Sequence, residues 1–128
     1  MRFLMMVKAD GDYEDCKPPS AALMEGMARL TVEMTEAGKL LSAEGLLPTR
    51  YGAARVKAAG GKRAVVDGPF AEAKEVIGGF AIMQAASLDE AKALVERFID
   101  VHEQAGVFDV DVEIRTLADG GNCGGQPQ

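Results

Sequence analysis

The order of apolar and polar residues along the chain predicts a mixed α and β protein with six strands and two long helices. Strands are expected at residues 2–9, 39–47, 53–59, 62–67 and 76–86 and in the alternating stretch 108–115, because these runs are apolar or repeat every two residues. Helices are expected over 20–37 and 87–105, where apolar residues recur at spacings of three and four. The stretch 10–19 is expected to be a polar loop, and 71–75 a single helical turn.

Both helices have recognisable ends. Ser20 is a candidate N-cap for the first helix, and Gly38 is its stop signal. Ser87 and Glu90 form a capping box for the second helix, and Gly106 ends it. The stripes expected to face the core are Leu23, Met27, Leu30 and Met34 in the first helix, and Ala91, Leu94, Val95, Phe98 and His102 in the second.

The strand patterns favour an α+β, ferredoxin-like fold. The strands at 2–9 and 76–86 are apolar on both faces, which is typical of central strands, whereas the last strand alternates apolar with charged residues, as an edge strand does. The two strands around Gly60 and Gly61 form a hairpin. If this hairpin is an insertion, the remaining order is βαββαβ, the ferredoxin-like motif.

Two helices cover only one face of such a sheet, so its other face needs a separate cover. We assign Leu4, Met6, Ala81 and Met83 to that other face. A second copy of the chain is the simplest cover. Two sheets packed face to face would form a dimeric α/β barrel with a cleft for a small ligand.

Composition and charge narrow the function classes. The 128 residues suit one domain, expected over 1–117, followed by a flexible Gly-rich tail over 118–128. A net charge of -6 argues against binding to nucleic acid or to anionic membranes. The first apolar run, residues 3–7, is too short for an export signal or a membrane span. Cys16 and Cys123 form neither a disulfide framework nor a metal cluster, so we expect a cytoplasmic protein without metal or cofactor.

One segment resembles a known family. Asp67-Gly68-Pro69-Phe70, followed by Lys74-Glu75 and Gly78-Gly79-Phe80, is similar to the DGPF branch of the YCII-related family. Supporting segments are Lys8, Glu44-Gly45-Leu46, Gly60-Gly61-Lys62-Arg63 and Glu113-Ile114-Arg115, so the similarity spans about residues 1–117.

The resemblance implies ferredoxin-like subunits in a dimeric α/β barrel, with Asp67 at a pocket. The family's biochemical function is largely unassigned. For YCII-like proteins an Asp–His catalytic pair is proposed, and the single histidine here is His102, in the second helix. The resemblance also implies a linkage to extracytoplasmic-function sigma factors, and with it a regulatory role.

The candidate site residues each have two interpretations. Asp67 is a candidate general acid or base if it is buried, and otherwise its carboxylate caps the turn at Gly68. His102 is a second catalytic candidate or a hydrogen-bonded structural residue. The candidate ligand-binding residues are Phe70, Lys74, Glu44 and Arg55.

Charged clusters are equally ambiguous. Basic residues around the hairpin would meet an anionic substrate or keep an exposed ribbon from aggregating. Asp109, Asp111 and Glu113 could hold a hard cation or simply line an exposed edge.

Three functions therefore compete. The first is a small-molecule-binding homodimer with a regulatory role, favoured by the apolar open face and the absence of familiar catalytic motifs. The second is a cofactor-independent enzyme that uses Asp67 for proton transfer on a small organic substrate. The third is a structural partner of a sigma factor.

Overall fold

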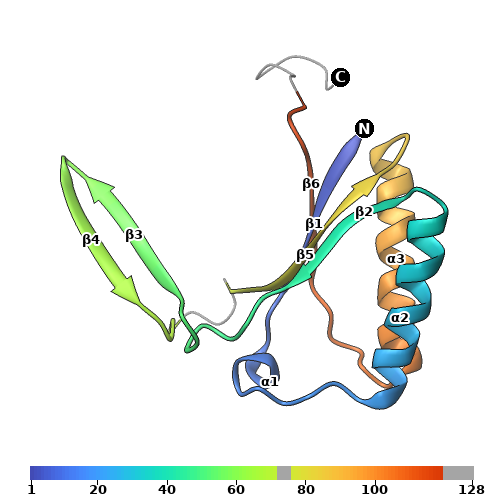
Figure 1. Ribbon diagram of the computed structural model, residues 1–128, viewed down its shortest axis with the longest axis horizontal. Helices are drawn as coiled ribbons and strands as arrows, with labels where there is room; N and C mark the ends of the chain where they lie inside the picture. Colours follow the sequence, from blue (N-terminus) through green and yellow to red (C-terminus); the bar gives the residue numbers. More distant parts are fainter. Residues whose placement is uncertain (72–75, 120–128) are drawn as a thin grey trace.

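A computed structural model describes residues 1–71 and 76–119 and shows an antiparallel sheet with two long helices on one side (Figure 1). The elements are β1 (Arg2–Lys8), α1 (Gly11–Glu14), α2 (Ala21–Glu36), β2 (Leu40–Gly45), β3 (Ala54–Ala59), β4 (Lys62–Asp67), β5 (Ile77–Gln84), α3 (Leu88–Gln104) and β6 (Val112–Thr116). The predicted helical turn at 71–75 lies almost wholly outside the described residues. None of the described helices is long and apolar enough to cross a membrane.

The main sheet has the strand order β2-β5-β1-β6, and the hairpin β3–β4 forms a separate two-stranded sheet. β1 and β5 are therefore central and β6 is an edge, as the apolar patterns predict. All neighbouring pairs in the main sheet are antiparallel. The α+β class is confirmed, and the strand order is compatible with the ferredoxin-like topology.

The register decides which side chains face the helices. Met5 pairs with Ala81 and Phe3 pairs with Met83, and directly opposed residues share one face of a sheet. Ala81 and Met83 are 3% and 1% exposed, so they belong to the helix-covered core. Their assignment to the open face was wrong, because a strand that is apolar on both sides does not reveal its phase.

The open face is instead formed by the residues that alternate with this core set. Leu4 pairs with Ile82, and Met6 pairs with Phe80. All four side chains are half-buried in the single chain. This face points away from α2 and α3.

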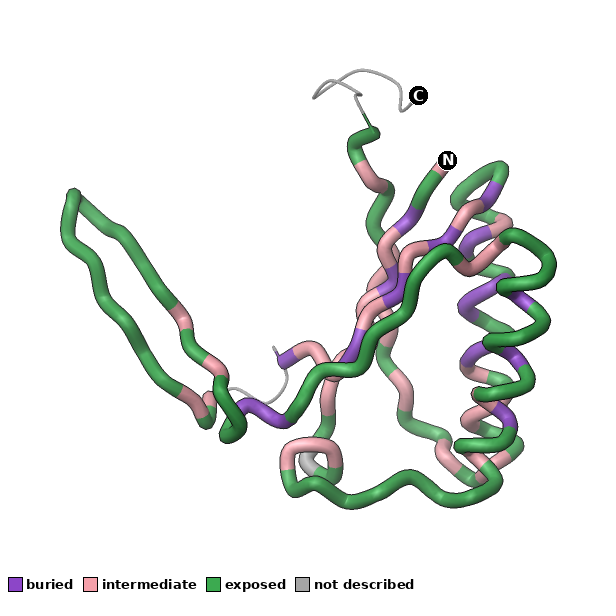
Figure 2. Tube along the Cα trace, in the orientation of Figure 1, coloured by how far each residue is buried: buried purple, intermediate pink, exposed green. Residues whose placement is uncertain are grey.

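The core lies between the helix face of the sheet and the apolar stripes of α2 and α3 (Figure 2). The two helices approach closely at Gly26. A Cβ added there would lie only 2.8 Å from Cγ1 of Val101. The buried core consists of Phe3, Met5, Leu30, Met34, Ala81, Met83, Ala85, Ala91, Leu94, Val95 and Phe98. Most of both predicted helical stripes is confirmed. The exceptions are Leu23 and His102, which are half-buried and lie outside the core cluster.

The helix N-termini also follow the sequence. Ser20 Oγ accepts from the amide of Leu23, and Ser87 Oγ accepts from the amide of Glu90, each at 3.2 Å. The carboxylate of Glu90 accepts a 2.5 Å hydrogen bond from Lys39 Nζ, which lowers the pKa of Glu90. This bond ties the start of α3 to the chain just before β2.

Two segments differ from expectation. The supposed polar loop at 10–19 contains the short helix α1, which begins where Asp10 Oδ1 accepts from the amide of Tyr13 at 2.8 Å. The last strand is shorter than its alternating pattern, because residues 108–111 are not in a strand. At the start of the predicted tail, Asp119 pairs with Arg2, which lowers the pKa of Asp119; residues 120–128 lie outside the described part.

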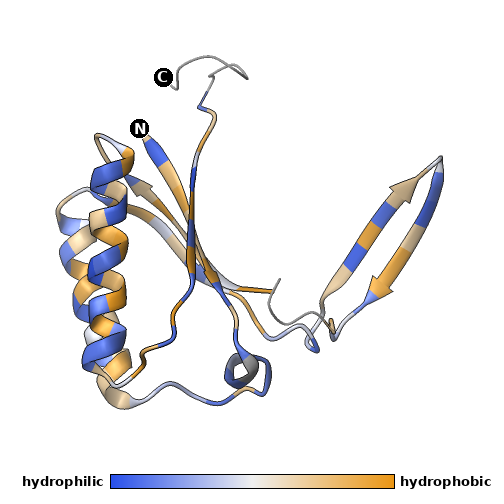
Figure 3. Ribbon diagram, turned by 180° about the vertical axis from the view of Figure 1, so that it is seen from behind, coloured by the Kyte–Doolittle hydropathy of each residue, from blue (hydrophilic) through white to orange (hydrophobic). Residues whose placement is uncertain are grey.

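The hairpin stands apart from the rest of the fold. Its register runs from Ala54 opposite Asp67 to Ala59 opposite Lys62, and Gly60 and Gly61 supply the positive φ angles of the turn. The main sheet lies between the helices and this hairpin (Figures 1 and 3). The hairpin therefore projects on the open-face side.

Candidate functional site

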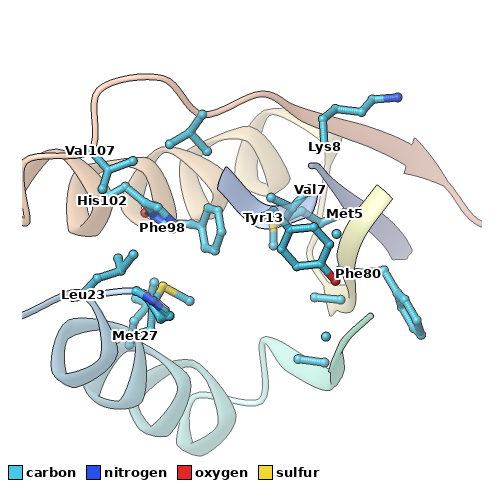
Figure 4. Close-up of a pocket in the computed structure, with 18 of the residues that line it drawn as sticks. Met5, Val7, Lys8, Tyr13, Leu23, Met27, Phe80, Phe98, His102 and Val107 are labelled. Carbon is cyan, nitrogen blue, oxygen red and sulfur yellow. Dashed lines mark hydrogen bonds between the residues drawn. The ribbon is translucent and has the colours of Figure 1, made fainter. Parts of the chain in front are cut away.

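A pocket lies between the helix face of the sheet and the helices α2 and α3 (Figure 4). Its volume is about 720 Å³, which falls in the range of small-molecule sites. Its apolar walls include Met5 from the sheet, Leu23 and Met27 from α2, and Leu94 and Phe98 from α3. The core is therefore incompletely filled at the end of the molecule nearest α1.

Tyr13 reaches this pocket from α1. Its ring lies against β5, where a Cβ added at Gly78 would be 3.5 Å from the ring carbons. The hydroxyl is buried and has no hydrogen-bond partner within the described residues. Burial raises the pKa of Tyr13, and the nearby charges of Glu14 and Cys16 raise it further. At neutral pH the hydroxyl is thus an unsatisfied donor.

His102 lines the same pocket from the last turn of α3, on the side away from Tyr13 (Figure 4). Its Nδ1 lies 2.9 Å from the carbonyl oxygen of Phe98, and the two rings have centroids 4.4 Å apart. Because a carbonyl only accepts, Nδ1 carries the proton and the neutral ring has its lone pair on Nε2. The histidine is thus both anchored in its helix and part of the pocket wall.

A buried polar cluster holds α1 in place. The carboxylate of Glu14 accepts from the amide of Thr49 at 3.0 Å and from its hydroxyl at 2.6 Å. The same hydroxyl accepts from the amide of Phe70 at 3.0 Å. Thr49 is 6% exposed, whereas Glu14 and Phe70 are half-buried, so these bonds are partly shielded from water. The cluster connects the Asp67–Phe70 turn to the short helix that carries Tyr13.

Gly68 makes this connection possible. A Cβ at this position would lie 1.9 Å from the carbonyl oxygen of Thr49, so only glycine allows the two backbones to approach so closely. The amide of Gly68 donates to the carbonyl of Ala53 at 2.8 Å. Since the amides of Gly68 and Phe70 have these other acceptors, the interpretation that Asp67 caps them was wrong.

Asp67 itself is the last residue of β4 and is exposed. It lines neither the pocket between the sheet and the helices nor a second pocket at the base of the hairpin. The structure therefore separates this carboxylate from His102, which lies in the pocket beneath the sheet.

A second pocket of about 530 Å³ lies at the base of the hairpin. Arg55 and Phe70 both line it, and the Arg55 guanidinium lies 4.1 Å from the centre of the Phe70 ring. Glu44 lies on β2, where it pairs with Phe80 of β5, and it borders the first pocket. Lys74 is outside the described residues. His102 and Glu44 thus line one pocket, Arg55 and Phe70 line the other, and Asp67 lines neither.

Sequence reasoning missed Tyr13, Glu14 and Thr49. All three fall in segments without apolar periodicity, and the hydroxyl partners of Thr49 are 35 and 21 positions away along the chain. Of the segments that form this cluster, only the Asp67–Phe70 turn, which contributes the Phe70 amide, was singled out by the sequence. Within the two described ranges, no group of three or more His, Cys, Asp or Glu residues could hold a metal ion.

These features define an α+β domain with a ligand-sized pocket between its sheet and its helices. The model of the YCII-related domain matches residues 1–115, so the chain belongs to the YCII-related family. It is also 34% identical over 102 residues to an uncharacterized protein of Rhizobium meliloti (strain 1021). The aligned region covers 80% of this chain and 78% of that protein. The family resemblance is confirmed.

Proposed function

We propose that the protein binds a small, largely apolar molecule in the pocket between the sheet and the helices, and that it does so as a homodimer. The observation that carries this proposal is the unpaired hydroxyl of Tyr13 in an apolar pocket of about 720 Å³. A buried polar group without a partner costs about 1–3 kcal/mol. Because the hydroxyl is covered while the pocket is empty, Tyr13 must shift slightly to donate to a ligand, and that hydrogen bond would recover the free energy.

Two of the polar groups that line the pocket suggest the chemistry of the ligand. Tyr13 supplies a neutral donor, and Nε2 of His102 supplies an acceptor when the ring is neutral. The remaining wall is mainly apolar. A ring compound with a carbonyl or hydroxyl group fits this combination.

The homodimer is supported by the open face of the sheet. Leu4, Met6, Phe80 and Ile82 form a contiguous apolar surface on the central strands β1 and β5. The chain's own long helices lie on the opposite face (Figure 1). A second copy with the same surface would cover it.

The alternative function is a cofactor-independent enzyme in which Asp67 transfers a proton. It receives less support, because Asp67 is exposed and borders neither pocket. A general acid or base must lie within hydrogen-bonding reach of its substrate.

Two neutral naphthalene probes test the binding proposal by fluorescence titration. Prodan carries a ketone that can accept from Tyr13, whereas N-phenyl-1-naphthylamine has no carbonyl group. We expect both probes to bind saturably to the natural protein. Tyr13→Phe should weaken prodan binding about 5-fold to 10-fold, the worth of one hydrogen bond, and leave the other probe unchanged.

A matched pair of tryptophan variants locates the probe. Leu23 lines the pocket, whereas its neighbour Met24 is 59% exposed and does not. Leu23→Trp should fill the pocket and abolish binding of both probes, and Met24→Trp should leave it intact. Equal binding by both tryptophan variants, or no saturable binding by the natural protein, would contradict the proposal.

A further inference from the structure

The hairpin β3–β4 carries apolar side chains that are exposed in the described part of the chain. Val56 and Val65 are directly opposed across the two strands and are 70% and 64% exposed. Val66, on the other face, is 49% exposed. Within the described residues the hairpin has no third strand, and an isolated two-stranded ribbon is at best marginally stable in water. Such a ribbon needs a surface to pack against.

The charge of the hairpin differs in sign from that of the remaining chain. Residues 54–67 contain four basic side chains, Arg55, Lys57, Lys62 and Arg63, and one acidic side chain, Asp67, so they carry a net charge of +3. The whole chain carries -6, which leaves -9 on the other residues. A second copy of this chain therefore offers an acidic body that complements the basic hairpin.

The position of the hairpin points to the same occupant. It projects on the open-face side of the sheet, away from α2 and α3 (Figures 1 and 3). The open face and the hairpin thus border one region, which residues 1–71 and 76–119 leave uncovered. A copy that covered Leu4, Met6, Phe80 and Ile82 would also come alongside the hairpin.

We infer that the hairpin is a dimerisation arm, which packs its Val56–Val65 face against the second copy of the chain. This inference rests on the homodimer of the proposed function and adds a second contact to it. The open sheet faces form one part of the interface, and the two arms form the other. The basic side chains of each arm then lie near the acidic body of the partner.

Sedimentation equilibrium of the full chain tests the arm with a matched set of lysine variants. Val56→Lys/Val65→Lys should raise the dimer dissociation constant at least about 100-fold, because two valines that would be buried become charged. Val32→Lys is the control, since Val32 is 55% exposed on α2, on the opposite side of the sheet. It should change the dissociation constant less than about 3-fold. Thermal unfolding followed by circular dichroism checks that each variant folds.

Trypsin supplies a readout specific to the arm. Lys57, Lys62 and Arg63 are exposed in the single chain. Cleavage there should therefore be fast at protein concentrations below the dimer dissociation constant and slow at concentrations above it. The arm contact is refuted if Val56→Lys/Val65→Lys does not change the dissociation constant of the dimer, or if trypsin cleaves the arm equally fast at all protein concentrations. Either result leaves the homodimer itself standing. A natural protein that is monomeric at 100 µM overturns both, whereas probe binding reports on the pocket separately.

Discussion

Replacing Gly68 by alanine should disrupt the cluster that joins the Asp67–Phe70 turn to α1. The added Cβ would lie 1.9 Å from the carbonyl oxygen of Thr49, whereas real Cβ contacts essentially never fall below 3.0 Å. The two backbones must therefore separate by about 1 Å. The atom in the way belongs to the backbone, so no side-chain rotation relieves the clash.

A separation of that size removes the hydrogen bond from the Phe70 amide to Thr49 Oγ1, which is 3.0 Å long in the structure. An unsatisfied group at a buried site costs about 1–3 kcal/mol, and the distorted backbone adds about 1 kcal/mol. We expect Gly68→Ala to lower the free energy of unfolding by about 2–4 kcal/mol. For a domain of this size that corresponds to a decrease in Tm of about 10 °C.

Urea denaturation followed by circular dichroism, at one fixed protein concentration, measures the difference. Gly45→Ala is the matched control, because a Cβ added at Gly45 has no atom within 4 Å and its φ is not positive. That variant should stay within about 0.5 kcal/mol of the natural protein. The steric reasoning is refuted if the two alanine variants are equally stable.

Two further predictions concern the same region. Thr49→Val should lower the free energy of unfolding by about 1–3 kcal/mol in urea denaturation, because Glu14 and the amide of Phe70 lose the buried hydroxyl as a hydrogen-bond partner. The control Thr35→Val, at an exposed position of α2, should change the free energy of unfolding by less than about 0.5 kcal/mol. Equal effects of the two variants would contradict a role for the cluster. The pKa of Tyr13 is raised in the folded state, so its contribution to stability is fully present below about pH 10 and is lost as pH rises above that value. Denaturation between about pH 9 and 11 should therefore show a steeper loss for the natural protein than for Tyr13→Phe, and parallel curves would count against burial of the hydroxyl.

The elements that sequence predicted correctly depend on local interactions. The stripe of α2, its N-cap Ser20 and the two-glycine turn of the hairpin follow from helical periodicity, capping and backbone conformation, which involve residues close in the chain. The central positions of β1 and β5 were also predictable, because a strand that is apolar on both sides is typical of a sheet interior.

The phase of those strands was not predictable. An alternating strand shows which of its sides faces solvent. Both sides of β5 are apolar, with Phe80 and Ile82 on one side and Ala81 and Met83 on the other. Only pairing with β1 and packing against the helices place Ala81 and Met83 in the core. Residue type alone suggested the opposite orientation as readily.

For the site, the sequence by itself placed a turn at Gly68, directly after Asp67, and it identified His102 as part of the inner stripe of α3. Only the tertiary structure showed that Asp67 stays outside both pockets, and that Tyr13 enters one of them. The physical reason is distance along the chain. The bonds that position Tyr13 join Glu14 to Thr49 and Thr49 to Phe70, and such contacts exist only after the sheet and helices have brought these segments together.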